Sequence, residues 1–231
     1  MIAQIVETDH PVVLLGAGDF QADILTLSLA RAKTLVAADG GANAAIAEGH
    51  HPDAVIGDFD SLEESVRTAL PPDRFYHIAE QDSTDFEKCL TRISSPLILA
   101  VGFTGARLDH TLAVCNALVR HHDRPCVVLG SDDVCFVLPR KLVLNLPTAT
   151  CVSIFPMAKV RAKSTGLIWP IDDVPFAPDG PIGTSNAASG GRVEIWTEAP
   201  GLLGFLPLAF LDQVVGELSP GETAALSRPS R

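Results

Sequence analysis

Apolar residues in the first 130 positions gather in short uninterrupted runs, and the segments between these runs show helical spacing. The runs at 12–15, 54–56 and 97–101 contain only apolar or small residues. Between them, apolar residues recur three or four positions apart, as on one face of a helix. Fully apolar strands that alternate with helices are typical of a parallel sheet covered on both faces. This part of the chain is therefore predicted to be an α/β domain.

Turn and cap signals give the expected elements their ends. Gly49 is a typical C-cap residue, and Thr84 with Glu87 forms a capping-box pattern at a helix start. The expected strands are 12–15, 35–38, 54–56, 75–78, 97–101 and 126–129. The expected helices are 23–32, 42–48, 62–70, 84–93 and 108–121.

The pattern changes after about residue 134, where helical spacing fades and prolines become frequent. Short strand-like pieces are expected at 134–138, 141–145, 150–155, 159–163 and 192–196. Such pieces favour a small all-β sandwich, and the segment 172–191 is expected to be a long loop. The predicted fold is thus a Rossmann-like parallel-sheet domain at 1–133, followed by a β-sandwich domain at 134–231.

Composition narrows the function classes. The chain has 231 residues, 47% of them hydrophobic and 19% charged, which suits a packed core. A net charge of −11, with no basic stripe, argues against nucleic acid as a partner. No run of 18 apolar residues occurs, so no membrane span is expected. The five cysteines contain no Cys-x-x-Cys pair and the N-terminus does not resemble a signal peptide, so a cytoplasmic protein with buried thiols is expected.

Acidic residues cluster where predicted strands end or helices begin. Asp39 follows one strand, Asp58 and Asp60 follow the next, and Asp85 and Asp109 lie at helix starts. In an open parallel sheet, ligands bind outside the carboxyl ends of the strands, so these carboxylates are expected at one edge. Hard oxygen ligands of this kind suit Mg²⁺ bound with a phosphate-bearing substrate.

Other residues near these carboxylates are candidates for holding phosphate. Gly40 and Gly41 allow a ligand to approach the backbone closely, and Arg107 offers a guanidinium that can grip phosphate oxygens. Lys88 is a second candidate cation, and His110 is a candidate general base or positioning residue. The alternative for Arg107 is an ion pair with Asp109 or Asp85. Neither a P-loop motif nor a dinucleotide-binding glycine motif is present.

Six strings, taken in order, resemble the thiamine pyrophosphokinase family. They are Asp39-Gly40-Gly41-Ala42-Asn43, Gly57-Asp58-Phe59-Asp60-Ser61, Asp82-Ser83-Thr84-Asp85-Phe86-Glu87-Lys88, Gly105-Ala106-Arg107-Leu108-Asp109-His110, Gly166-Leu167-Ile168-Trp169-Pro170 and Thr184-Ser185-Asn186. Each string alone is weak, whereas all six in this order are highly specific. The resemblance covers about residues 12–197.

The resemblance implies a homodimer that transfers pyrophosphate from ATP to the hydroxyethyl oxygen of thiamine, giving thiamine diphosphate and AMP. It implies Asp58, Asp60 and Asp85 as Mg²⁺ ligands. It further implies that a set of polar residues holds the nucleotide, its phosphates or the attacking hydroxyl; the set is Asp39, Gln81, Arg107 and Asp109.

Thiamine itself is expected in the second domain. The resemblance assigns the pocket to Trp169, Thr184, Ser185 and Asn186, and an aromatic face suits the cationic thiazolium ring. The alternative for Trp169 is a core residue that caps the sandwich.

Three other functions compete with this interpretation. A pyrophosphokinase for another alcohol, such as a hydroxymethylpterin, would share the aspartates and differ in the second domain. A phosphatase with Asp58 as its nucleophile would also place Asp-x-Asp after a strand, but the β-rich second half disfavours it. A thiamine or nucleotide sensor without activity is the third.

Overall fold

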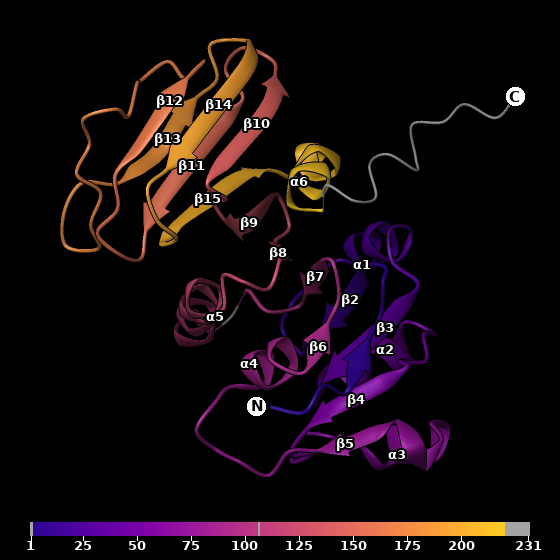
Figure 1. Cartoon of the computed structure of the whole chain (residues 1–231). Coiled ribbons are helices and arrows are strands. Elements are labelled where there is room, and N and C mark those ends of the chain that lie inside the picture. Colours follow the sequence, from indigo (N-terminus) through magenta and orange to yellow (C-terminus); the bar gives the residue numbers. More distant parts are fainter. Residues whose placement is uncertain (1, 106, 220–231) are drawn as a thin grey trace, which may run out of the picture. The chain divides into compact units, whose positions relative to one another are not determined.

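The computed structural model describes residues 2–105 and 107–219, and the chain divides into two compact units at 1–131 and 132–231 (Figure 1). Ala106, within the fourth matched string, and the tail from 220 lie outside the described residues.

The first unit is built on parallel strands made of the apolar runs. These strands are β2 (Val12–Leu15), β3 (Thr34–Ala38), β4 (Ala54–Gly57), β5 (Phe75–His77), β7 (Ile98–Val101) and β8 (Cys126–Leu129). They pair in the order β8-β7-β2-β3-β4-β5, and each pairing among them is parallel. Every residue of β2, β4, β7 and β8 is buried, as expected for strands covered on both faces.

Helices connect the strands and lie on both sides of them (Figure 1). They are α1 (Ala22–Leu29), α2 (Gly41–Ala47), α3 (Glu64–Ala69), α4 (Asp85–Leu90) and α5 (Leu108–Arg120), with a 3₁₀ turn at Pro72–Arg74. From β2 the chain moves through β3 and β4 to β5, then returns to the other side of β2 to form β7 and β8. Right-handed crossovers therefore place α1, α2 and α3 on one face and α4 and α5 on the other.

The reversal between β2 and β7 creates a point where the loops after neighbouring strands run in opposite directions. A crevice at the carboxyl ends of the strands is expected at such a point. The mixed α/β character predicted from the sequence is confirmed for this unit, because strands and helices alternate as expected.

One helix of this unit is shorter than predicted. The Thr84 side chain does cap α4, accepting a hydrogen bond from the Glu87 backbone N–H at 3.3 Å. However, α4 ends at Leu90 instead of continuing to residue 93. Ile93 instead opens β6 (Ile93–Ser94), which pairs in parallel with β1 (Val6–Glu7). This distant pairing takes the backbone groups that a longer helix would have used.

The second unit is mostly antiparallel strands. They are β9 (Asp133–Val137), β10 (Lys141–Leu146), β11 (Cys151–Pro156), β12 (Ala162–Thr165), β13 (Gly183–Ala187), β14 (Gly191–Thr197) and β15 (Leu202–Pro207). One set pairs in the order β13-β11-β15-β9 and the other in the order β10-β14-β12. A 3₁₀ turn (Leu208–Phe210) and helix α6 (Leu211–Leu218) follow. Buried residues alternate along β10, β11 and β12, so each has one core-facing side.

Several predictions for this unit were wrong or incomplete. β13 lies inside the segment expected to be a long loop, and β12 begins at Ala162 instead of residue 159. β15 and α6 were not predicted at all. Cys151 is exposed, contrary to the expectation of buried thiols, although none of the five cysteines, all among the described residues, forms a disulfide. Within the described residues, we find no helix both long enough and apolar enough to cross a membrane.

Gly41 holds α2 close to β2. A Cβ atom at this position would collide with the backbone carbonyl oxygen of Leu15. The glycine therefore serves helix–strand packing, whereas the sequence suggested an approach to ligand. Of Gly40 and Gly41, only Gly40 is among the described residues that line a cleft at the carboxyl ends of the strands.

Gly41→Ala is expected to lower the free energy of unfolding by about 2–3 kcal/mol, because the collision with Leu15 is with backbone and must be relieved by shifting α2. Gly49→Ala is the matched control: its φ of +78° is unfavourable for alanine, but nothing lies within 4 Å of the new Cβ. Its cost should be about 1 kcal/mol. Urea unfolding of both variants tests this, and an equal or smaller loss at Gly41 would contradict the packing role.

Candidate functional site

A cleft of about 640 Å³ opens at the carboxyl ends of the parallel strands in the first unit. Its walls come from the segments that follow β2, β3, β4 and β7 and from the starts of α4 and α5. Among the lining residues are Asp39, Asp58, Asp60, Gln81, Asp85, Lys88, Arg107 and His110. The cleft therefore gathers Asp39, Asp58, Asp60 and Asp85 at one edge of the sheet. Asp109, which was expected with them, is not among the described lining residues.

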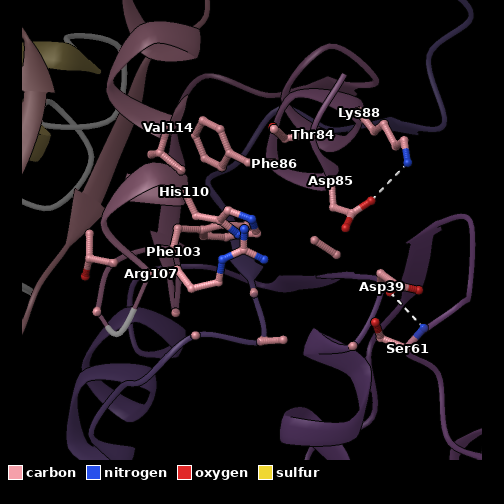
Figure 2. Close-up of a pocket in the computed structure, with 18 of the residues that line it drawn as sticks. Asp39, Ser61, Thr84, Asp85, Phe86, Lys88, Phe103, Arg107, His110 and Val114 are labelled. Carbon is pink, nitrogen blue, oxygen red and sulfur yellow. Dashed lines mark hydrogen bonds and ion pairs between the residues drawn. The ribbon is translucent and has the colours of Figure 1, made fainter. Parts of the chain in front are cut away.

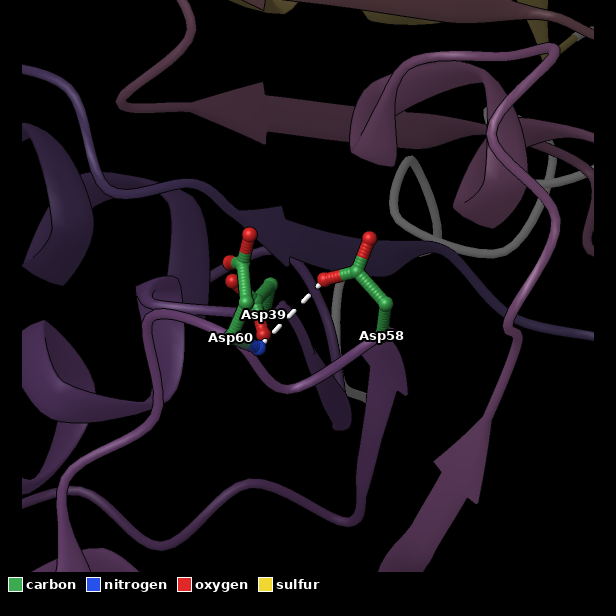
Figure 3. A group of neighbouring side chains, drawn as sticks. All are labelled: Asp39, Asp58 and Asp60. Carbon is green, nitrogen blue, oxygen red and sulfur yellow. Dashed lines mark hydrogen bonds between the residues drawn. The ribbon is translucent and has the colours of Figure 1, made fainter.

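Three aspartates form the acidic centre of the cleft (Figure 3). Asp39, Asp58 and Asp60 each offer a carboxylate oxygen, and these oxygens lie within 4.8 Å of one another. The resemblance grouped Asp85, not Asp39, with Asp58 and Asp60. In the described residues Asp39 takes that place, and Asp85 is connected to Asp58 through a lysine.

Asp39 has an unsatisfied polar atom. Its side chain is buried, with one oxygen accepting a hydrogen bond from the Ser61 backbone N–H at 3.3 Å. The other oxygen, Oδ1, is the one buried side-chain polar atom without a hydrogen-bond partner among the described residues. Burial raises the pKa of Asp39, and the charge of Asp85 raises it further. A buried carboxylate oxygen without a donor is costly, so this site suits a cation.

Asp58 is held by two donors from the next segment of the chain. Its Oδ2 accepts hydrogen bonds from Gln81 Nε2 at 2.8 Å and from Lys88 Nζ at 3.0 Å. These two bonds, that of Gln81 first, lower the pKa of Asp58 to about 2. Asp58 is therefore ionised at neutral pH.

Lys88, a candidate cation for phosphate, is buried in the wall of the cleft. Its side chain is 2% exposed, and Nζ lies 3.0 Å from Asp58. Nζ also lies 3.1 Å from Asp85, the ion pair drawn in Figure 2. Burial alone would lower the pKa of Lys88, but the hydrogen bonds to the two carboxylates raise it overall. The lysine thus neutralises charge within the acidic wall.

Arg107 and His110 lie on another wall of the cleft, near Phe103 and away from Asp39 (Figure 2). Arg107 Nη2 donates to Asp109 at 2.7 Å, the ion pair that the sequence left open as an alternative. Both partners are exposed, so this pair is held weakly and can exchange for a phosphate. The hydrogen bond from Arg107 lowers the pKa of Asp109, which is not among the described lining residues.

Glycine-containing loops form the floor between these walls. Gly16 and Gly102 approach each other so closely that a Cβ on either would lie 2.5–2.7 Å from the other's carbonyl oxygen. Gly16, Ala17 and Gly18, which follow β2, line the cleft, as do Asp19 and Ser61; none of these residues was named as a candidate from the sequence. The sequence feature that could have identified these residues as lining the cleft is their position shortly after predicted strands.

The second unit contains the residues expected to bind thiamine. Trp169 is 59% exposed, so the alternative of a core tryptophan is wrong. Asn186 is buried, and its amide donates to the Trp169 carbonyl at 2.7 Å and accepts from the Trp169 N–H at 3.3 Å. Thr184 and Ser185 are exposed on β13, and Ser185 has a φ of +60°. Asn186 therefore positions the tryptophan segment.

Two family models match successive parts of the chain. The model for the thiamin pyrophosphokinase catalytic domain matches residues 25–129, and that for the thiamin pyrophosphokinase vitamin B1 binding domain matches residues 141–202. A curated relative, thiamine pyrophosphokinase 2 of Arabidopsis thaliana, is 30% identical over 67% of this chain and 71% of its own length. The chain belongs to the thiamin pyrophosphokinase family.

Other members of the thiamin pyrophosphokinase family agree in length and fold. Thiamine pyrophosphokinase 1 of Oryza sativa is 28% identical over 73% of this chain and 77% of its own. The structure of thiamin pyrophosphokinase from Candida albicans superposes with a TM-score of 0.74 at 17% identity, covering 86% of this chain and 89% of its own. That from Geobacillus thermodenitrificans gives 0.70 at 24% identity, covering 85% and 96%. The resemblance expected from the sequence is thus confirmed.

Gln81→Leu should weaken the pH-dependent part of the stability. The pKa of Asp58 is about 2 in the folded protein, below the ~3.9 of an unfolded aspartate. The hydrogen bonds to Asp58 therefore stabilise the fold fully above about pH 4, and this contribution is lost as the pH falls towards 2. The variant should therefore be about 1 kcal/mol less stable at pH 6, and the difference should shrink by pH 3. Urea unfolding in EDTA measures this, and a difference independent of pH would exclude Asp58 as its source.

Proposed function

We propose that this chain catalyses the thiamine pyrophosphokinase reaction, in which the pyrophosphoryl group of ATP passes to the hydroxyethyl group of thiamine to give thiamine diphosphate and AMP. The observation that carries the proposal is the group of Asp39, Asp58 and Asp60 in a cleft that also holds Arg107. Such a cleft combines a cation site with a phosphate-binding guanidinium, as phosphoryl-type transfer requires.

Mg²⁺ is the proposed cation. Asp58, Asp60 and the unpartnered oxygen of Asp39 provide hard oxygen ligands close enough to share one ion. Asp85 remains a proposed ligand, because it lines the same cleft and is joined to Asp58 through Lys88. When bound, Mg²⁺ would withdraw charge from the phosphate oxygens.

The remaining cleft residues are proposed to bind ATP and orient the attacking hydroxyl. Arg107 would exchange Asp109 for phosphate oxygens, with His110 beside it and Gly40 leaving room at the opposite wall. The carboxylate of Asp109, released from Arg107, would then orient the hydroxyl by accepting its hydrogen bond. The hydroxyl oxygen forms a bond to the β-phosphorus while the bond from the β-phosphorus to the bridging oxygen breaks. AMP leaves with that oxygen, and the hydroxyl proton passes to solvent.

Thiamine recognition is proposed for the second unit, whose matched family model carries the vitamin B1 binding description. The exposed ring of Trp169 offers a face to the cationic thiazolium, and Thr184 and Ser185 offer hydroxyls from β13. We also propose that the two antiparallel sets of strands pack as a sandwich around the buried side of β10 and β11, and that the first unit is Rossmann-like. The proposed functional domains are 1–133 and 134–231.

A homodimer and a cytoplasmic location complete the proposal. Leu108 and Leu112, one turn apart on α5, are 72% and 56% exposed, which suits an interface with a second copy. The five cysteines form no disulfide among the described residues, which suits a reducing compartment.

The first test is an assay with purified protein, ATP, Mg²⁺ and thiamine, with products separated by chromatography. Equal amounts of AMP and thiamine diphosphate, lost with EDTA, are expected. Asp58→Asn should lower kcat by about a thousandfold, which is about 4 kcal/mol of transition-state stabilisation. Asp73→Asn, at an exposed position in the 3₁₀ turn, is the control and should retain activity. Absence of thiamine-dependent AMP would redirect the search to another alcohol, such as a hydroxymethylpterin.

Trp169→Ala should raise the KM for thiamine about tenfold and leave the KM for ATP unchanged, because the ring contributes about 1–2 kcal/mol of cation–π contact. Steady-state kinetics with each substrate varied in turn measures both constants. A parallel rise in both values would show that the variant disturbs the enzyme in general.

A further inference from the structure

The turn that carries two of the clustered carboxylates has an unfavourable backbone. We call residues 58–63 the carboxylate turn; it follows β4 and ends before α3. Phe59, between Asp58 and Asp60, has a φ of +66°. A bulky residue rarely adopts this conformation, so surrounding contacts must maintain it. The turn also holds like charges together, which favours its opening.

Asn43 holds the end of the carboxylate turn with both atoms of its amide. Its Nδ2 donates to the Ser61 carbonyl oxygen at 2.8 Å, and its Oδ1 accepts from the Glu63 backbone N–H at 3.0 Å. Asn43 lies on α2, directly beyond the Asp39 segment. One amide therefore ties the helix that follows Asp39 to the turn that carries Asp58 and Asp60.

Arg67 holds the strained residue from α3. Its Nη2 donates to the Phe59 carbonyl oxygen at 3.1 Å, and its guanidinium carbon lies 5.7 Å from the centre of the Phe59 ring. The ring also packs edge-on against Phe75, with centroids 5.8 Å apart. These contacts fix the backbone on which both aspartates depend.

We propose that Asn43 and Arg67 are positioning residues that fix the carboxylate turn so that Asp58 and Asp60 are close to Asp39 before a divalent cation binds. The proposal rests on the proposed metal site. Neither residue is among the described residues that line the cleft, and both act on backbone groups of the turn. Their effect on a cation is therefore through preorganisation of its ligands, as for outer partners of metal sites in general.

The second unit offers a matched control. Gln213 on α6 also uses both amide atoms on backbone, donating to the Asn145 carbonyl oxygen at 2.9 Å and accepting from the Asn145 N–H at 2.8 Å. Gln213→Ala thus removes the same kind of contact as Asn43→Ala, at a position unconnected with the carboxylate turn.

The test compares Asn43→Ala, Arg67→Met and Gln213→Ala after removal of metal with EDTA. Mn²⁺ binding is measured by electron paramagnetic resonance, and folding by thermal unfolding. Asn43→Ala and Arg67→Met should each raise the Kd for Mn²⁺ about tenfold. Gln213→Ala should leave it within about twofold of wild type, even with a similar loss in Tm. In the thiamine assay, the first two variants should need more Mg²⁺ for half-saturation and approach the wild-type kcat at high Mg²⁺.

A wild-type Kd in either turn variant would overturn the proposal, as would an equal rise in Gln213→Ala, which would show that any loosening of the fold weakens the site. Arg67 is 41% exposed at its side chain, so Arg67→Met still gives a decision if Asn43→Ala does not fold. Wild-type protein that binds Mn²⁺ but does not convert thiamine would contradict the proposed function, and the order of the Kd values would still test the positioning roles.

Discussion

The buried ammonium of Lys88 is the interaction on which the acidic wall of the cleft depends. It lies within 3.1 Å of a carboxylate oxygen on each of Asp58 and Asp85, and almost none of its side chain contacts water. A buried charge of this kind is tolerated only when it is paired and hydrogen-bonded. Conversely, the two carboxylates can approach each other only because the ammonium lies between them. Loss of the lysine would leave two uncompensated charges beside a third, Asp60.

This charge balance is possible because the parallel sheet brings distant segments to one edge. Asp39 and Asp58 each follow a strand, and β3 and β4 are neighbours in the sheet. Lys88 lies on α4, which packs on the face of the sheet opposite to α2, and the first turn of α4 lines the same cleft. The reversal of strand order beside β2 therefore supplies the crevice, and the loops after the strands supply its charge.

Much of the first unit could be predicted from the sequence because its signals are local. A four-residue apolar run between turn residues, such as Val12–Leu15, is typical of a buried strand. Thr84 caps its helix by accepting a hydrogen bond from Glu87, only three residues further along the chain. The second unit gave weaker signals. Gly183–Ala187 contains small and polar residues, and it becomes a strand only through pairing with β11 at the edge. The pairing of Lys88 with Asp58 could not be predicted for the same reason, since the two residues are 30 positions apart.

Backbone strain is concentrated in the segments proposed for function. The non-glycine residues with positive φ are Asp39, Phe59, Ala149 and Ser185 among the described positions. Three of these, Asp39, Phe59 and Ser185, lie in strings that resemble the family. Each of the three makes a hydrogen bond with a residue from elsewhere in the chain. Ser61 donates to the Asp39 carboxylate, Arg67 donates to the Phe59 carbonyl, and the Ser185 N–H donates to Ser153. Such conformations cost about 1–3 kcal/mol each, so they persist only where the surrounding contacts impose them. Since Asn43 on α2 and Arg67 on α3 hold the carboxylate turn without lining the cleft, residues outside the acidic centre help determine its shape, and the carboxylates alone do not specify the site.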